Sequence, residues 1–229
     1  MTTLERLQNW YLRQCDGEWE RTYGILIGTI DNPGWMVGVS LKDTTLEKKP
    51  FDRIEKEHSE HNWVHAWIAD DDVFECACGP ENLDEALSIF CDWANSHLGG
   101  HVGQDPFLIS ESRRDTITTL ERLQKWYLRH CDGEWPGHGN GIFIRTLDNP
   151  GWLVGIDLIR PLDNPGWVVR VSLKDTPLEK KPFDRIERER SEHNWVQAWI
   201  AGDGFSCACG PENLDEALSI FCDWVSSHE

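Results

Sequence analysis

The five residues Asp31-Asn32-Pro33-Gly34-Trp35 lie between two short runs rich in β-branched and other apolar side chains. Proline at the second turn position and glycine at the third suit a type II turn, because proline presets φ and glycine accepts positive φ. In the run that follows, side chains two apart fall on one face of a strand, which places Trp35, Val37 and Val39 together. The stretch therefore predicts a β-hairpin with a tryptophan at its exit.

The same five residues recur at 148–152 and at 163–167. Around them the chain repeats itself, and residues 79–93 are identical to residues 210–224. Self-similarity of this kind is typical of a duplicated domain. The repeats therefore predict two copies of one fold.

We place the first copy at residues 1–97 and the second at residues 118–229. Residues 98–117 between them contain several glycines and a proline without a clear period, which is typical of a linker. The second copy carries a 15-residue insert, because one further strand and turn precede the third motif. That extra unit must either loop out of the sheet or displace its neighbour.

Each copy is expected to open and close with a helix. Thr2 and Glu5 have the spacing of a capping box, and Pro80 suits the first position of the closing helix. Four or five short antiparallel strands lie between the helices, including a charged edge strand within residues 53–58. The fold class is therefore α+β, with two tandem copies of a helix, an antiparallel sheet and a helix, and with the helices on one sheet face.

The chain is strongly acidic, with a formal net charge of −18. This charge repels nucleic acid and anionic lipid and attracts basic partners. Thirteen tryptophans and 39% hydrophobic residues indicate a globular protein. No apolar run reaches the roughly 18 residues of a membrane span, and the N-terminus lacks the layout of a signal peptide. We therefore expect a cytoplasmic protein.

The eight cysteines are expected to be free thiols in the cytoplasm. The Cys76-Ala77-Cys78 segment does not have the usual zinc spacing, so we predict no metal and no cofactor. Cys78 directly precedes the Gly-Pro expected to open a helix, whose dipole would lower the pKa of its thiol. A thiol nucleophile at Cys78 and its counterpart Cys209 is the catalytic alternative.

The turn Cys-Asp-Gly-Glu-Trp after the first helix of each copy is the candidate contact site. A tryptophan beside carboxylates has the composition of an interface hot spot for a basic partner. The alternative is a tryptophan that closes the core beneath the loop. The residues are Asp16, Glu18 and Trp19 in the first copy and Asp132, Glu134 and Trp135 in the second.

Both copies contain, in the same order, Leu-Gln-x-Trp-Tyr, Cys-Asp-Gly-Glu-Trp, Asp-Asn-Pro-Gly-Trp, Ser-Glu-x-Asn-Trp and Gly-Pro-Glu-Asn-Leu. Together these segments resemble the immunity protein 53 family of bacterial polymorphic toxin systems. The resemblance covers nearly all of each copy and leaves out the linker and the insert. It implies a small protein that binds and neutralises a toxin without catalysis, and the acidic charge would suit a basic toxin such as a nuclease. The rival interpretation is a thiol-based, sulfurtransferase-like enzyme that uses the Cys-x-Cys cysteines.

Overall fold

The two copies contribute five strands each to one antiparallel sheet. The computed structural model describes residues 1–30, 33–97, 117–131, 141–146 and 165–228. The first copy runs through α1 (Thr3–Gln14), α2 (Trp19–Thr22), β1 (Ile25–Ile30), β2 (Gly34–Ser40), β3 (Ile54–Glu57), β4 (Trp63–Ala69), β5 (Val73–Cys78) and α3 (Leu83–Ser96). The second runs through α4 (Thr119–His130), β6 (Ile142–Thr146), β7 (Trp167–Ser172), β8 (Ile186–Glu189), β9 (Trp195–Ala201), β10 (Gly204–Cys209) and α5 (Leu214–Ser226).

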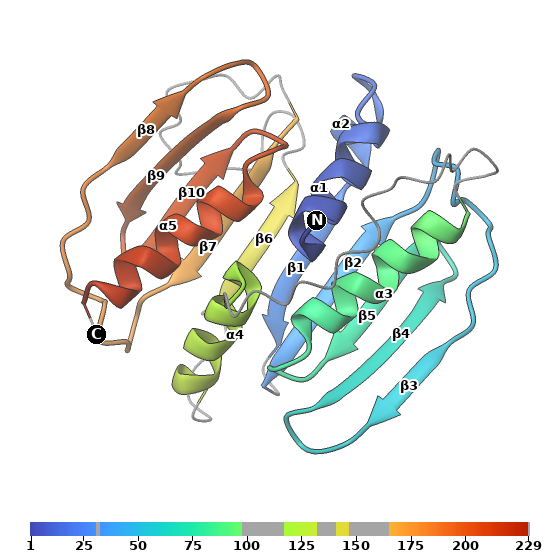
Figure 1. Ribbon diagram of the computed structural model, residues 1–229, viewed down its shortest axis with the longest axis horizontal. Helices are drawn as coiled ribbons and strands as arrows, with labels where there is room; N and C mark the ends of the chain where they lie inside the picture. Colours follow the sequence, from blue (N-terminus) through green and yellow to red (C-terminus); the bar gives the residue numbers. More distant parts are fainter. Residues whose placement is uncertain (31–32, 98–116, 132–140, 147–164, 229) are drawn as a thin grey trace.

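The strands lie in the order β3-β4-β5-β2-β1-β6-β7-β10-β9-β8 (Figure 1). At the centre β1 pairs with β6, with Leu26 opposite Arg145 and Gly28 opposite Phe143. The α+β class is confirmed, but the expectation of a separate four- to five-stranded sheet in each copy is wrong. Unpaired, β1 and β6 would each expose a row of backbone donors and acceptors, and their pairing supplies the missing partners. We call this β1–β6 pair the seam.

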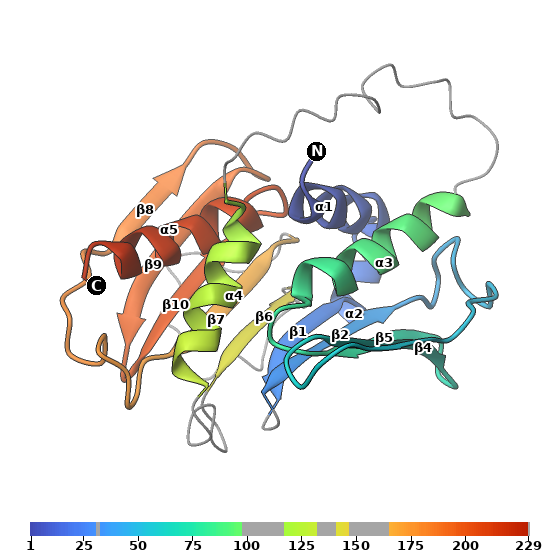
Figure 2. The ribbon, with the colours of Figure 1, turned by 60° about the horizontal axis from the view of Figure 1, so that its bottom comes forward.

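All four long helices cover the same face of the sheet, as predicted (Figure 2). The predicted capping box is present, since the Glu5 amide donates to Thr2 Oγ1 at 3.2 Å and the Thr2 amide donates to the Glu5 carboxylate at 2.6 Å. α1 packs against α3 of its own copy, where the rings of Trp10 and Phe90 meet edge to face at 4.8 Å. None of the described helices is long and apolar enough to cross a lipid bilayer.

Each copy also contacts the other through its first helix. Gln8 on α1 accepts a hydrogen bond from the Asp215 amide at the start of α5 at 3.1 Å and donates to the Glu212 carbonyl at 2.6 Å. Gln124 on α4 accepts in the same way from the Asp84 amide at the start of α3, at 3.0 Å. These contacts are reciprocal. The two copies are therefore arranged like the subunits of a two-fold symmetric dimer within one chain.

The closing helix begins later than the sequence pattern indicated. α3 starts at Leu83, so the predicted start at Pro80 is wrong. The Asn82 side chain accepts a hydrogen bond from the Trp63 amide at 3.1 Å, and the Pro80 carbonyl accepts one from Trp35 Nε1 at 3.1 Å. These bonds hold the segment after β5 against the sheet, and the helix begins only beyond it.

The Asp-Asn-Pro-Gly-Trp motif accompanies a hairpin in both copies. In the first, Ile30 pairs with Gly34 across the β1–β2 hairpin, which confirms the prediction. In the second, β6 pairs directly with β7, with Thr146 opposite Trp167. The third motif, rather than the second, therefore leads into the strand beside β6. The second motif, the rest of the insert and residues 98–116 of the predicted linker lie outside the described residues.

Candidate binding surface

The acidic turn after α1 is held by its own carboxylates. Asp16 Oδ1 accepts hydrogen bonds from the amides of Trp19 and Glu18, both at 2.9 Å, and these bonds lower the pKa of Asp16. The Glu20 carboxylate accepts from the amides of Asp16 and Gly17 at 3.0 and 2.9 Å. Gly17 has a φ of +96°, which favours glycine. Asp16 therefore shapes the turn, while Glu18 is an exposed carboxylate.

Trp19 does not lie on the surface, so the expectation of an exposed aromatic side chain is wrong. Its exposed fraction is 3%, its Nε1 donates to the Lys42 carbonyl at 2.8 Å, and its ring meets Trp10 edge to face at 5.9 Å. The alternative interpretation, a tryptophan that closes the core beneath the loop, matches this placement. The counterparts Asp132, Glu134 and Trp135 lie outside the described residues.

The Cys-x-Cys thiols lie in the core on the helix-covered face. All eight cysteines are free, and Cys78 and Cys209 are completely buried. A hydrogen bond with Cys76 and burial raise the pKa of the Cys78 thiol, and burial and a hydrogen bond with Cys207 raise the pKa of the Cys209 thiol. A reactive thiol needs access and a lowered pKa. The predicted lowering by a helix dipole is therefore wrong, and the arrangement does not favour a cysteine nucleophile.

The histidines near these cysteines do not complete a metal site. His65 lies opposite Ala77 in the β4–β5 ladder, so it points to the other sheet face from Cys76 and Cys78. Within the described ranges, no group of three or more His, Cys, Asp and Glu side chains could hold a metal ion.

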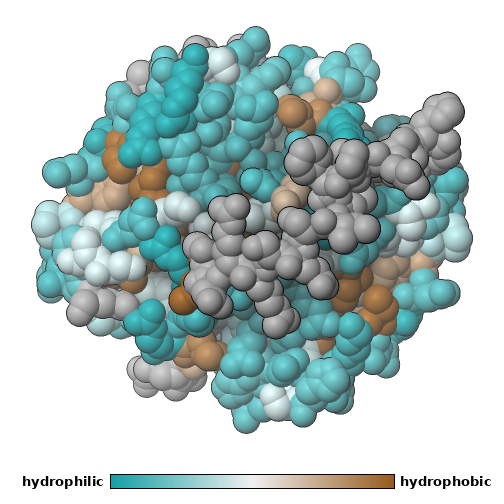
Figure 3. Space-filling model, in the orientation of Figure 1, coloured by the Kyte–Doolittle hydropathy of each residue, from teal (hydrophilic) through white to brown (hydrophobic). Residues whose placement is uncertain are grey.

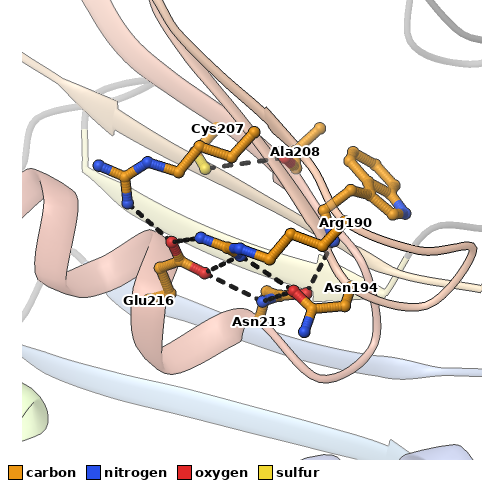
Figure 4. Close-up of polar contacts among 8 residues, drawn as sticks. Arg190, Asn194, Cys207, Ala208, Asn213 and Glu216 are labelled. Carbon is orange, nitrogen blue, oxygen red and sulfur yellow. Dashed lines mark hydrogen bonds and ion pairs between the residues drawn. The ribbon is translucent and has the colours of Figure 1, made fainter.

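The Glu216 carboxylate at the start of α5 belongs to a polar network (Figure 4). It accepts hydrogen bonds from Arg190 at 2.8 Å, from Arg188 at 2.7 Å and from Asn213 at 3.0 Å. These bonds, Arg190 first, lower the pKa of Glu216 to about 2. General acid–base catalysis favours a pKa near the working pH. The network therefore joins α5 to β8 and the turn after it, and it does not resemble a catalytic carboxylate.

The sheet face opposite the helices carries exposed apolar side chains. Leu26 on β1, Met36 on β2 and Phe143 on β6 are 43%, 45% and 41% exposed, on three adjacent strands. Their strand neighbours, such as Ile27 and Val37, face the helices and are fully buried. The helix-covered side is mainly hydrophilic with scattered apolar patches (Figure 3). We call the other side of β2, β1 and β6, which carries no helix among the described residues, the open face; further into the second copy the same side is buried at Val168, Trp195 and Trp199.

Sequence reasoning missed the open face. The pattern that places Trp35 and Val37 on one side also places Met36 on the other, so the alternation itself was the available signal. An outward apolar side chain is common, however, and does not by itself indicate a binding surface.

A groove of about 410 Å³ lies on the open face beside the seam. Both apolar and charged side chains line the groove. They include Tyr23, Leu26, Met36, Val73, Glu75 and Arg145. A concave surface with a few convergent polar groups is typical of a binding site.

Two arginines lie next to the exposed apolar side chains. Arg145 is opposite Leu26 across the seam, and Arg170 is opposite Phe143 in the β6–β7 ladder. Partial burial and the neighbouring Arg145 lower the pKa of Arg170. Among the described residues, neither guanidinium has a carboxylate partner. Around the seam this face therefore combines apolar surface with the positive charge of Arg145 and Arg170, while Glu75 is the acidic side chain in the groove wall.

The chain matches the sequence pattern of immunity protein 53 over residues 4–95, 120–161 and 158–226. The first match spans the first copy, and the other two overlap within the insert and together span the second copy. A search of curated proteins and a search of solved structures each found no match. An immunity protein of a polymorphic toxin system neutralises a toxin by binding it, without catalysing a reaction. Because the match covers most of both copies, the chain belongs to the immunity protein 53 family, as a tandem duplicate.

Proposed function

We propose that this chain neutralises its toxin by binding it as one folded unit, rather than as two independently binding domains. The seam supports this proposal, because backbone hydrogen bonds between β1 and β6 join the copies into one sheet. Two tethered but separate domains would gain avidity from their linker. Here the copies already share one sheet, so a single toxin can contact side chains from both.

The net charge of −18 supports a basic toxin, and a nuclease is a candidate because an enzyme that binds a polyanion is often basic. Long-range attraction would accelerate association and weaken with salt. The acidic turns are one proposed contact for such a toxin, with Glu18 exposed in the first copy and Trp19 supporting the turn from beneath. The corresponding contact in the second copy is proposed for Asp132, Glu134 and Trp135.

Co-expression with the toxin encoded at the same locus tests the function. We expect the chain to protect the host cell and to capture an inactivated form of the toxin in a pull-down, more strongly at low than at high salt. Light scattering of the purified complex should give one toxin per chain. Absence of both protection and capture would overturn the proposed function, and two toxins per chain would overturn binding as one unit.

The thiol alternative has its own control. Because Cys78 and Cys209 are buried, we expect the double variant Cys78→Ala/Cys209→Ala to protect the cell as well as the unaltered chain does, provided that a thermal melt shows it folded. Protection that disappears in a folded double variant, together with thiosulfate or persulfide transfer by the unaltered chain, would favour the enzyme.

A further inference from the structure

On four of the five strands of each copy, the two copies agree on one face of the sheet and differ on the other. On the remaining strand, β3 or β8, the helix-side pair Lys56 and Arg188 differs instead. On the helix-covered face of β1, β2, β4 and β5, each residue is identical to its counterpart in the second copy, as in Ile27 and Ile144 or Val37 and Val169. On the opposite face of the same strands, seven pairs of described residues differ. They are Leu26 and Phe143, Gly28 and Arg145, Met36 and Val168, Gly38 and Arg170, His65 and Gln197, Val73 and Gly204, and Glu75 and Ser206.

Exposure alone does not account for this difference. α1 and α4 are also partly exposed, yet over their 12 residues they differ only at Asn9, which is Lys125 in α4, and at Gln14, which is His130. The changes on the open face are also larger in kind, since two glycines correspond to two arginines. This side of the sheet is therefore where the two halves have become chemically unequal. It is exposed at Leu26, Met36 and Phe143 and buried at Val168, Gln197 and Ser206.

The inequality is greatest at the arginines. Arg145 and Arg170 lie diagonally across β6 and β7, within reach of each other, and burial together with charge repulsion from Arg145 lowers the pKa of Arg170. The chain has 40 acidic and 22 basic residues, yet within its described part no carboxylate pairs with these two. Their counterparts Gly28 and Gly38 would avoid the repulsion. A carboxylate supplied by a partner would relieve it and would form charge-assisted hydrogen bonds with the guanidinium groups.

The apolar groove begins next to this charge. Leu26 lines the groove and lies opposite Arg145, while Met36 lines it from β2. Phe143, which is exposed, lies opposite Arg170. Arginine and aromatic side chains together are typical of the residues that carry most of the binding energy in protein interfaces. The arginine pair and the apolar groove are thus close enough for one short segment of a partner to contact both.

We infer that the seam surface, formed by Leu26, Met36, Phe143, Arg145 and Arg170, docks a toxin segment in which a carboxylate stands beside an apolar side chain. The carboxylate binds Arg145 and Arg170, and the apolar side chain enters the groove at Leu26 and Met36. This inference rests on the proposed function. It is compatible with a basic toxin, because the net charge acts at long range whereas the two arginines select a local carboxylate. Since the halves differ on this face, one toxin binds in one orientation.

Charge reversal tests the surface against a matched control. The variant Arg145→Glu/Arg170→Glu is compared with Lys49→Glu/Lys181→Glu, which makes the same change in net charge at exposed, equivalent positions of the two copies. The probe is the purified, catalytically inactivated toxin from the same locus, and affinity is measured by calorimetry. We expect the arginine variant to lose at least 100-fold in affinity and the lysine variant less than threefold. Equal effects of the two variants would overturn the inference.

Filling the groove provides a second test that introduces no acidic side chain. A side chain at Gly38 has room, because a Cβ placed there meets no atom within 4 Å. Gly38→Arg copies the second half into the first and places a long side chain in the groove that Gly38 lines. We expect unchanged thermal stability and at least a tenfold loss of affinity. A folded Gly38→Arg variant with unaltered affinity would show that the groove is not occupied.

The chemistry of the partner is tested by compensation. Each Asp and Glu of the toxin is changed to Arg in turn and titrated against Arg145→Glu/Arg170→Glu, and we expect one substitution to restore at least tenfold of the lost affinity. The inference that a toxin carboxylate binds these arginines is wrong if no substitution restores affinity. It is also wrong if Arg145 and Arg170 instead bind a labelled RNA or DNA oligonucleotide. If the unaltered chain does not bind the toxin at all, the proposed function itself fails, so the two failures are distinguishable.

Discussion

The hydroxyl of Tyr127 in the second copy donates a hydrogen bond to the carbonyl of Gly34 in the first at 3.1 Å and accepts one from the Gly34 amide at 2.9 Å. Tyr11 of the first copy makes the same two bonds with Gly166, at 3.4 and 3.3 Å. The Tyr127 ring also packs on Trp35, with centroids 4.8 Å apart. The Gly-Trp end of the repeated motif is therefore a contact between the two copies as well as the exit of a hairpin.

The variant Tyr127→Phe should destabilise the protein by about 1–3 kcal/mol, because it removes two hydrogen bonds to the buried backbone of Gly34. Tyr11→Phe should cost less, because its hydrogen bonds are longer. Urea denaturation followed by tryptophan fluorescence measures both values. A loss below about 0.5 kcal/mol for Tyr127→Phe would show that these bonds do not stabilise the contact between copies.

Cutting the chain between the copies should leave them associated. A protease site inserted between residues 98 and 116 would separate the polypeptides, while the seam and the reciprocal glutamine contacts would still join them. We expect the cleaved protein to elute as one species in size-exclusion chromatography, with a denaturation midpoint that depends on protein concentration. Elution as two separate monomers would contradict the continuity of the sheet.

Glu216 should make the protein sensitive to acid. Its pKa in the folded state is about 2, below the ordinary value of 4.5, so its network stabilises the fold above about pH 4.5. That stability is lost as the pH falls from 4.5 toward 2. Glu216→Gln should therefore cost about 2 kcal/mol at pH 7, allowing for the partial exposure of the side chain, and should flatten the fall of Tm between pH 5 and pH 3.

The matched control for Glu216 is Glu85→Gln in the first copy. The pKa of Glu85 is also lowered, through Lys56 at 2.7 Å and Asn82 at 3.0 Å, but arginines replace the lysine and histidine of this network in the second copy. We expect a smaller loss of stability from Glu85→Gln. An equal loss from the two variants would show that the two arginines add nothing to the network.

Alkaline pH should also destabilise the protein. Burial raises the pKa of Cys91 and Cys222 from the ordinary 9.0 to about 12. Both thiols therefore stay protonated in the folded protein, and the stability that this gives is present below pH 9 and is lost as the pH rises from 9 to 12. At pH 10.5 the loss should be roughly 1–2 kcal/mol per thiol.

Thermal melts with a reductant at pH 8 and pH 10.5 measure this effect. Cys91→Ala/Cys222→Ala removes both thiols, so its Tm should depend less on pH over the same range. A Tm of the unaltered protein that does not change between the two values would contradict the burial of these groups in their protonated form.

Local patterns in the sequence determined the elements of this protein. The capping box of Thr2 and Glu5 and the apolar alternation around Trp35 each act through residues close in the chain, so a helix or a strand can be predicted from them. The duplication, the α+β class and the family resemblance follow from the same short-range information. The predicted start at Pro80 failed because contacts from Trp35 and Trp63, far away in the sequence, hold that segment.

The tertiary structure decided how the copies combine and which surface remains open. Pairing of β1 with β6 depends on two strands more than 100 residues apart, and alternation within either strand is the same whether its edge is paired or free. Trp19 beside its carboxylates resembles an exposed anchor, and only the packing of Trp10 against it shows that it is buried. The sequence by itself thus determined that the chain is a tandem immunity protein. Only the tertiary structure placed Arg145 beside Leu26 across the seam, because long-range pairing brings together side chains that no local pattern connects.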